Sequence, residues 1–137
     1  MIDFENRTNA QIKQEIFEEI KCVVAGSKMF ELIVVDDNEM QQINLEHRGL
    51  DKTTDVLSFP IKESKTHFIG SIIISIDTAE RVAKEMGHTL DEELKILFIH
   101  GLLHLLGFDH ETDNGQMRQE EAKIASKIGL KESLLSR

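Results

Sequence analysis

The sequence predicts one α+β domain over residues 1–137, with about four strands in a mixed sheet packed against several helices. A chain of 137 residues can bury one core, and 40% hydrophobic with 30% charged residues is a globular balance. Short runs of branched apolar residues, which favour strands, alternate with longer segments of helical periodicity. Three closely spaced histidines put the candidate site on a buried helix and the turn after it.

Four short segments are predicted to be strands, because they alternate apolar and polar residues or are rich in Val, Ile, Leu and Phe. The run Ile72–Ile74 indicates burial on both faces of the sheet. Pro60, the only proline, ends the third strand. The predicted strands are Met1–Glu5, Phe30–Val35, Asp55–Pro60 and His67–Ile76.

Five helices are predicted from apolar residues three and four positions apart and from residues that favour helix ends. Cys22 in the first helix is expected to be a buried small residue. Thr89 and Glu92 have the spacing of a capping box ahead of the fourth helix. The helices are expected from Thr8 or Asn9 to about Ala25, from Asn38 to His47, from Asp77 or Thr78 to Met86, from Thr89 to Leu106, and from Asp113 to Ile128.

Three histidines, His100, His104 and His110, have the spacing H-x3-H-x5-H. Residues four apart on a helix point the same way, so His100 and His104 can share one metal ion. Gly107 ends the helix, because glycine readily adopts the left-handed conformation, and His110 can then approach the same ion. Three imidazoles suit zinc best, with nickel, copper or iron as alternatives, and leave a fourth position for water or substrate.

The motif lacks the residue with which zinc peptidases activate water. In the H-E-x-x-H motif a glutamate follows the first histidine, and here that position is Gly101. The histidine spacing otherwise matches that of the metzincin peptidases. A peptidase or small-molecule hydrolase is therefore an alternative that Gly101 disfavours. Two further histidines, His47 and His88, are expected to be exposed and to bind no metal.

The formal net charge of −9 argues against indiscriminate binding to nucleic acid, because phosphate attraction needs local positive charge. Cys22 has no partner for an internal disulfide, and we expect neither a signal peptide nor a membrane span. These features favour a cytoplasmic protein. Any role on nucleic acid must then depend on a local basic patch or on a docking partner.

The segment from His100 to His110 resembles the signature of the YbeY family, bacterial rRNA maturation factors described as metal-dependent single-strand endoribonucleases. A second block agrees, namely Asn44–Gly49, Asp51 and Thr54–Pro60. The resemblance implies a small sheet flanked by helices and one zinc ion at His100, His104 and His110. It also implies a role in 16S rRNA 3′-end processing and ribosome quality control, with rRNA of the small subunit as partner. The acidic surface adds the expectation of a ribosomal or assembly-factor protein as docking partner.

Arg48 has two interpretations. By its position it is a cation at a helix C-terminus, which is a common stabilising arrangement. The resemblance instead matches it to the family's functionally important arginine, which makes it the candidate catalytic residue. Lys52, Lys62 and Lys65 are expected to form a basic rim with it.

The chain departs from the family pattern at two positions. The family often has proline where Thr53 stands and commonly has an acidic residue where Ser71 stands. The serine at position 71 puts in doubt any role for a strand carboxylate in tuning the site. A non-catalytic ribosome-assembly factor with structural zinc is a further alternative.

Overall fold

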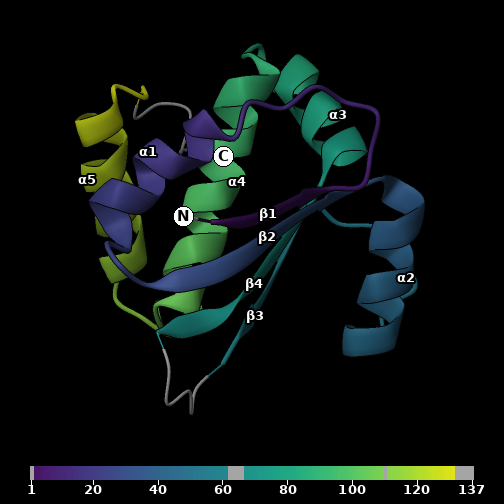
Figure 1. Cartoon of the computed structure of the whole chain (residues 1–137), viewed down its shortest axis with the longest axis horizontal. Helices are drawn as coiled ribbons and strands as arrows, with labels where there is room; N and C mark the ends of the chain where they lie inside the picture. Colours follow the sequence, from purple (N-terminus) through teal and green to yellow (C-terminus); the bar gives the residue numbers. More distant parts are fainter. Residues whose placement is uncertain (1, 62–66, 110, 132–137) are drawn as a thin grey trace.

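A four-stranded sheet with helices on both faces forms the centre of the fold (Figure 1). The computed structural model describes residues 2–61, 67–109 and 111–131. The strands are β1 (Asp3–Asn6), β2 (Met29–Val35), β3 (Val56–Pro60) and β4 (Phe68–Ser75). The helices in these ranges are α1 (Glu15–Val24), α2 (Asp37–Arg48), α3 (Ile76–Met86), α4 (Leu90–Leu105) and α5 (Gln116–Ile128).

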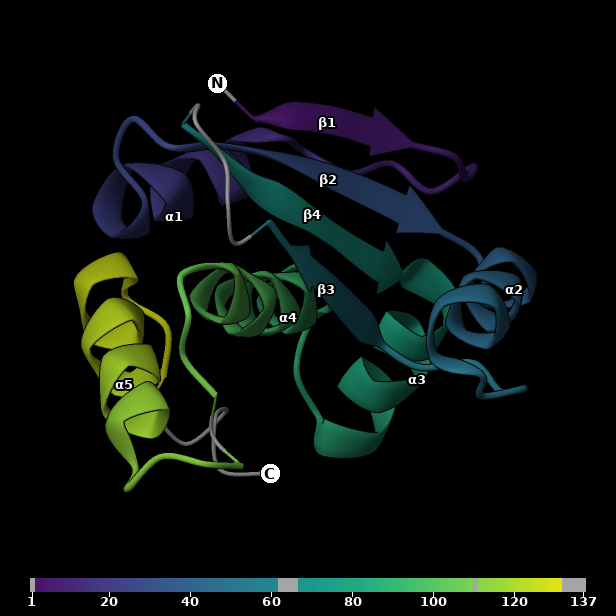
Figure 2. The same cartoon turned by 90° about the horizontal axis from the view of Figure 1, so that it is seen from below.

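The strands lie in the order β1-β2-β4-β3 (Figure 2). The pairs β1–β2 and β2–β4 are parallel, whereas β3 runs antiparallel to β4. In that last pair Ser58 lies opposite Ile72 and Phe59 lies opposite Ser71. The α+β class and the four-stranded mixed sheet predicted from the sequence are therefore confirmed.

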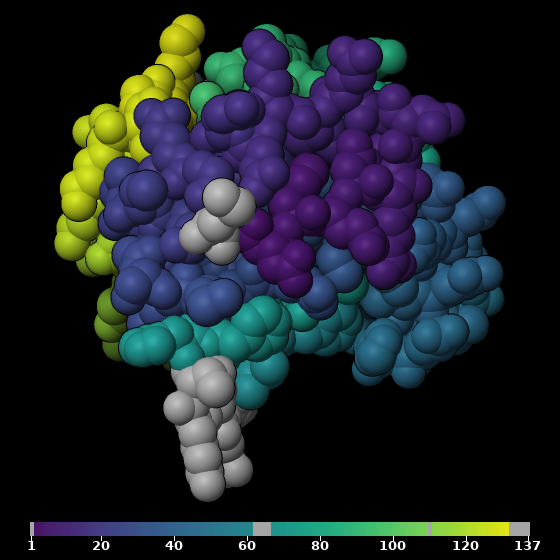
Figure 3. All heavy atoms as spheres, viewed as in Figure 1, coloured from purple at the N-terminus to yellow at the C-terminus, as the bar shows by residue number. Residues whose placement is uncertain are grey.

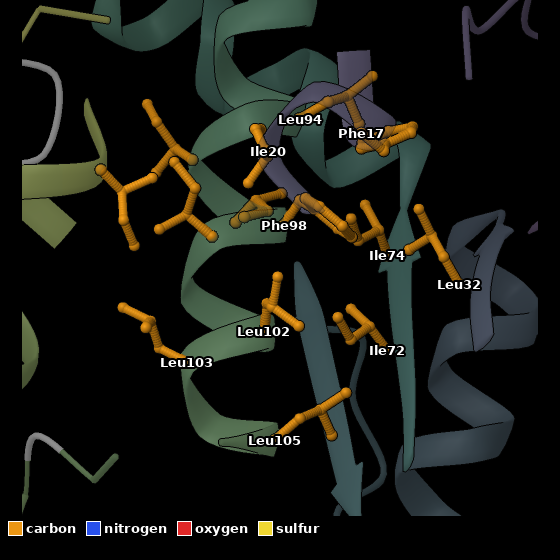
Figure 4. Close-up of a cluster of buried hydrophobic side chains, with 14 of the residues drawn as sticks. Phe17, Ile20, Leu32, Ile72, Ile74, Leu94, Phe98, Leu102, Leu103 and Leu105 are labelled. Atoms are coloured by element: carbon orange, nitrogen blue, oxygen red, sulfur yellow. The ribbon is translucent and has the colours of Figure 1, made fainter. Parts of the chain in front are cut away.

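Helix α4 is the main partner of the sheet, and it packs against β3 and β4. Phe98, Leu102 and Leu105 lie on the side of α4 that faces the strands, opposite Ile72 and Ile74 (Figure 4). Most of these side chains are fully buried, and each stabilises the fold by about 1.5–3 kcal/mol relative to exposure. The helix that carries the histidines is thus held by the largest part of the core.

The second face of the sheet is covered by α2. Val35, Met40, Leu57 and Ile73 form a separate buried cluster there. Ile73 belongs to this cluster, whereas Ile72 and Ile74 belong to the core cluster that packs against α4. The predicted burial of Ile72–Ile74 on both faces of the sheet is therefore confirmed. In the space-filling view, β1 and the segment after it cover the middle of the molecule between α1 and α2 (Figure 3).

Asp37 connects the start of α2 to the junction between β4 and α3. Its carboxylate accepts hydrogen bonds from Ser75 at 2.6 Å, Thr78 at 2.7 Å and Thr53 at 3.1 Å, and it pairs with Arg81 at 2.8 Å. Partial burial raises the pKa of Asp37, but these hydrogen bonds together outweigh it and lower the pKa from 3.8 to about 2. Thr53, a departure from the family pattern, therefore adds a hydroxyl to this network.

The prediction for the first helix is wrong at its start. Instead of capping a helix, Thr8 donates from its hydroxyl to Asn6 Oδ1 at 2.7 Å, and α1 begins only at Glu15. Such local side-chain bonds compete with helix formation. Cys22 is also exposed rather than buried, because it follows the buried Ile20 by two residues and so faces away from the core.

Among the described residues, none of the helices combines the length and the apolar character needed to cross a membrane.

Candidate functional site

Two of the three predicted metal ligands lie side by side on α4. The helix begins at a complete capping box, in which Thr89 accepts from the Glu92 amide and the Glu92 carboxylate accepts from the Thr89 amide. His100 and His104 lie in its C-terminal half, and both side chains are partly exposed. Their rings are 4.7 Å apart at 80°, and the two Nε2 atoms approach to 3.2 Å.

This geometry suits a shared metal ion. Two nitrogens bound to one tetrahedral zinc at about 2.0–2.1 Å lie roughly 3.4 Å from each other. The observed 3.2 Å between the Nε2 atoms of His100 and His104 is close to that value. The same distance would also allow one ring to donate a hydrogen bond to the other. Neutral imidazoles that converge in this way can bind zinc with little rearrangement.

The third predicted ligand, His110, lies outside the described residues. Its role as a ligand therefore stays a prediction. Within residues 2–61, 67–109 and 111–131, no set of three or more His, Cys, Asp or Glu side chains is arranged to hold a metal ion. Gly107, which precedes His110 by three residues, has φ 101°, so the chain leaves α4 through the predicted glycine turn.

Gly101 allows α4 to approach the sheet closely. A Cβ atom at this position would lie 2.9 Å from Ile72 Cγ2, 3.2 Å from Ser58 Oγ and 3.4 Å from Val56 Cγ2. The Ser58 hydroxyl also donates a hydrogen bond to the Gly101 carbonyl at 3.1 Å. The position of the peptidase glutamate therefore faces the sheet, and packing excludes a long side chain there.

Arg48 is the last residue of α2, and Gly49 follows it in the left-handed conformation at φ 71°. Its side chain is exposed and forms no ion pair with any residue that the structure describes. The residue before it, His47, packs its ring 5.1 Å from that of Phe59 on β3. Both interpretations of Arg48, helix-end cation and substrate contact, are compatible with this placement.

The edge strand β3 lies between the two parts of the site. Ser58 contacts α4 on one face of the sheet, and its neighbour Phe59 contacts His47 of α2 on the other. Of the predicted basic rim, Lys52 is exposed in the loop after α2. Lys62 and Lys65 lie outside the described residues.

The prediction that His88 is exposed is wrong. Only 3% of its side chain is exposed, and its Nε2 lies 2.7 Å from Oε1 of Glu93, which is fully buried. The turn between α3 and α4 folds His88 under the first turn of α4, a contact that the flanking sequence does not indicate. His47 is exposed, as predicted.

Ser71 is the second position at which the chain departs from the family pattern. Its hydroxyl donates to Glu31 on β2 at 2.8 Å. Ser71 belongs to the same face of β4 as Ile73, which packs under α2, and hence to the face opposite α4. A carboxylate at position 71 would therefore face away from the histidines.

One residue near the histidines was not predicted from the sequence. Glu121 on α5 brings its Oε1 atom to 3.4 Å from His100 Nδ1. The available signal was its spacing from Met117 and Ile124, which puts a carboxylate on the buried side of α5.

Comparison with known proteins agrees with this fold. The family model described as Endoribonuclease YbeY matches residues 2–129. Proteins named Endoribonuclease YbeY from Sulfurimonas denitrificans and Nautilia profundicola are 51% and 49% identical, each over the whole chain and 98% of the relative. The solution structure of TM1509 from Thermotoga maritima is 29% identical with a TM-score of 0.70, covering 93% of this chain and 89% of the other. The chain therefore belongs to the endoribonuclease YbeY family.

Proposed function

We propose that this protein is a zinc-dependent endoribonuclease that cleaves single-stranded RNA in 16S rRNA 3′-end maturation and ribosome quality control. Membership of the endoribonuclease YbeY family supports the activity and the substrate class. The observation that carries the metal assignment is the convergence of His100 and His104 at 3.2 Å. His110 would complete the ligand set from the turn after α4.

The chemistry follows from the ligand set. A zinc ion held by His100, His104 and His110 would supply a Lewis acid for a phosphoryl oxygen and would lower the pKa of water to about 7. The contribution of this chain is to keep His100 and His104 on the buried helix α4 with their Nε2 atoms 3.2 Å apart. Such preorganisation avoids a reorganisation penalty when the substrate binds.

Arg48 would bind the phosphate that is cleaved. A guanidinium can donate two parallel hydrogen bonds to non-bridging phosphate oxygens, and Arg48 is exposed at the end of α2. The contact between His47 and Phe59 holds this end of α2 against β3. The same strand contacts α4 through Ser58, so β3 sets the position of Arg48 relative to the histidines.

Recognition would depend on an assembled partner. The formal net charge of −9 repels RNA in general, so attraction would be confined to the expected basic rim of Arg48, Lys52, Lys62 and Lys65. We therefore expect weak, salt-sensitive binding to naked RNA and stronger action on the small ribosomal subunit, with a ribosomal protein or an assembly factor as docking partner, in the cytoplasm. Tight binding to arbitrary RNA that does not respond to salt would contradict this.

The alternatives are less well supported. A peptidase or other metzincin-like hydrolase would need its water-activating glutamate at position 101, where the contacts to Ile72 and Ser58 leave no room. A non-catalytic assembly factor would need a fourth protein ligand to close the zinc site. The relatives are named endoribonucleases, which favours a catalytic role instead.

The test is metal analysis of the purified protein followed by cleavage of immature small subunits with and without a chelator. His104→Ala should lose zinc and cleavage together. Arg48→Ala should abolish cleavage while zinc content and the thermal midpoint stay unchanged, and Arg118→Ala, another exposed arginine, serves as the matched control. Full activity of metal-free protein would refute the proposal, and loss of zinc in Arg48→Ala would refute the division of roles.

A further inference from the structure

Glu121 is the acidic residue that approaches the histidine pair from a different helix. Its Oε1 atom lies 3.4 Å from Nδ1 of His100, while Nε2 of the same ring lies 3.2 Å from Nε2 of His104. The two nitrogens of His100 thus face different partners. The distance to Glu121 is just beyond the 2.7–3.2 Å range of a strong hydrogen bond, and a small rotation of either side chain would close it.

The position of Glu121 on α5 is unusual for a carboxylate. Met117 and Ile124, four residues before it and three after it, are buried against the core. Glu121 therefore lies on the inward side of the helix, and only 15% of its side chain is exposed. Packing does not explain a charge there, because burying a carboxylate is unfavourable without a polar partner. His100 is a partner that α4 brings within reach.

We propose that Glu121 is a positioning residue that accepts the Nδ1 proton of His100 and so keeps the Nε2 lone pair directed toward the metal. This inference depends on the zinc site proposed above. Histidine ligands commonly donate their second ring nitrogen to a carboxylate, which fixes both the tautomer and the ring orientation. A neutral His100 with its proton on Nε2 could not bind zinc through that atom.

The test compares Glu121→Ala and Glu121→Gln with Glu120→Ala as the control. Glu120 is the preceding residue of α5, is more exposed and pairs only loosely with Lys123 at 3.9 Å. The first readout is zinc affinity by competition with a chelator. We expect a 10–100-fold loss for Glu121→Ala, as for other carboxylates behind a histidine ligand. Glu121→Gln should lose less, since its amide oxygen can still accept the Nδ1 proton, and Glu120→Ala should bind zinc like the wild type.

The second readout is the tautomer of His100, read from its ring 15N chemical shifts without metal. The wild type and Glu121→Gln should keep the proton on Nδ1, whereas Glu121→Ala should shift the population toward the Nε2 form. Thermal midpoints of the metal-free variants exclude a purely structural effect, and Glu121→Gln keeps the test open if the alanine variant does not fold.

Wild-type zinc affinity and an unchanged tautomer in Glu121→Ala would overturn the inference while leaving the zinc site intact. Equal losses in the alanine and glutamine variants would also overturn it. A wild-type protein that binds no zinc would instead refute the proposed function, and the tautomer measurement would still test the role of Glu121.

Discussion

Replacing Gly101 with alanine tests why this helix carries no glutamate after its first histidine. Alanine in place of glycine within a helix stabilises it by about 1 kcal/mol. Against this, the added Cβ would lie 2.9 Å from Ile72 Cγ2 and 3.2 Å from Ser58 Oγ, and Ile72 is fully buried. Overpacking of this kind costs about 1–3 kcal/mol. Since Ile72 has little room to move, the cost should exceed the helix gain, and we expect Gly101→Ala to lower the free energy of unfolding by up to about 2 kcal/mol.

Gly101→Glu should have a much larger effect. The carboxylate would be forced between α4 and the sheet without a partner, which costs several kcal/mol of a total stability of about 5–15 kcal/mol. Urea unfolding measured by circular dichroism gives the free energy of unfolding of both variants. In an Ile72→Leu background the Cγ2 methyl is gone, so the loss caused by Gly101→Ala should shrink. A Gly101→Ala variant more stable than the wild type, or a folded Gly101→Glu variant that cleaves casein, would refute the packing explanation.

Three further predictions concern residues away from the histidine pair. The pKa of Asp37 is lowered from 3.8 to about 2, so its ionised form stabilises the fold above pH 3.8. About 1–2 kcal/mol of the free energy of unfolding, a figure already reduced for partial solvent screening, should be lost as the pH falls from about 4 to about 2. The urea midpoints of the wild type and of Asp37→Asn should converge over this range. Glu93→Ala should lower the free energy of unfolding by about 2–4 kcal/mol, because His88 would stay buried without this carboxylate; a loss below about 0.5 kcal/mol would contradict the pair. Cys22 should react with a thiol reagent in the native protein as fast as in urea, and strong native protection would contradict its exposure.

The sheet and most helices could be predicted from the sequence because their signals are local. The capping box at Thr89 and the glycine after Arg48 mark helix ends that the structure has at the same places. The start of α1 was not predictable in this way, since Thr8 suits a helix cap and equally suits the side-chain bond to Asn6 that it forms. Local pattern alone does not decide between two such bonds.

Only the part of the candidate site that lies on one helix could be predicted from the sequence. His100 and His104 follow from the helical period alone, and their 3.2 Å approach agrees with it. Glu121 comes from a helix that begins after the histidine turn, so its approach to His100 depends on how α5 packs on α4. The burial of His88 depends likewise on a tertiary contact, with Glu93. The role of Arg48 rests on family resemblance and stays a prediction.

The edge strand β3 would account for the preference for single strands that we propose. Within the described residues, β3 pairs only with β4, so its other edge is free of strand partners. Ser58 and Phe59 are adjacent and point to opposite faces, toward α4 and toward the end of α2. On the proposed roles, a substrate that contacts both the histidines and Arg48 has to pass around this free edge. A single strand can bend over one strand of a sheet, whereas a double helix is stiff over tens of base pairs. On these proposed roles, selection against duplex RNA would follow from the placement of the two groups on opposite faces of one strand and would need no base-specific contact.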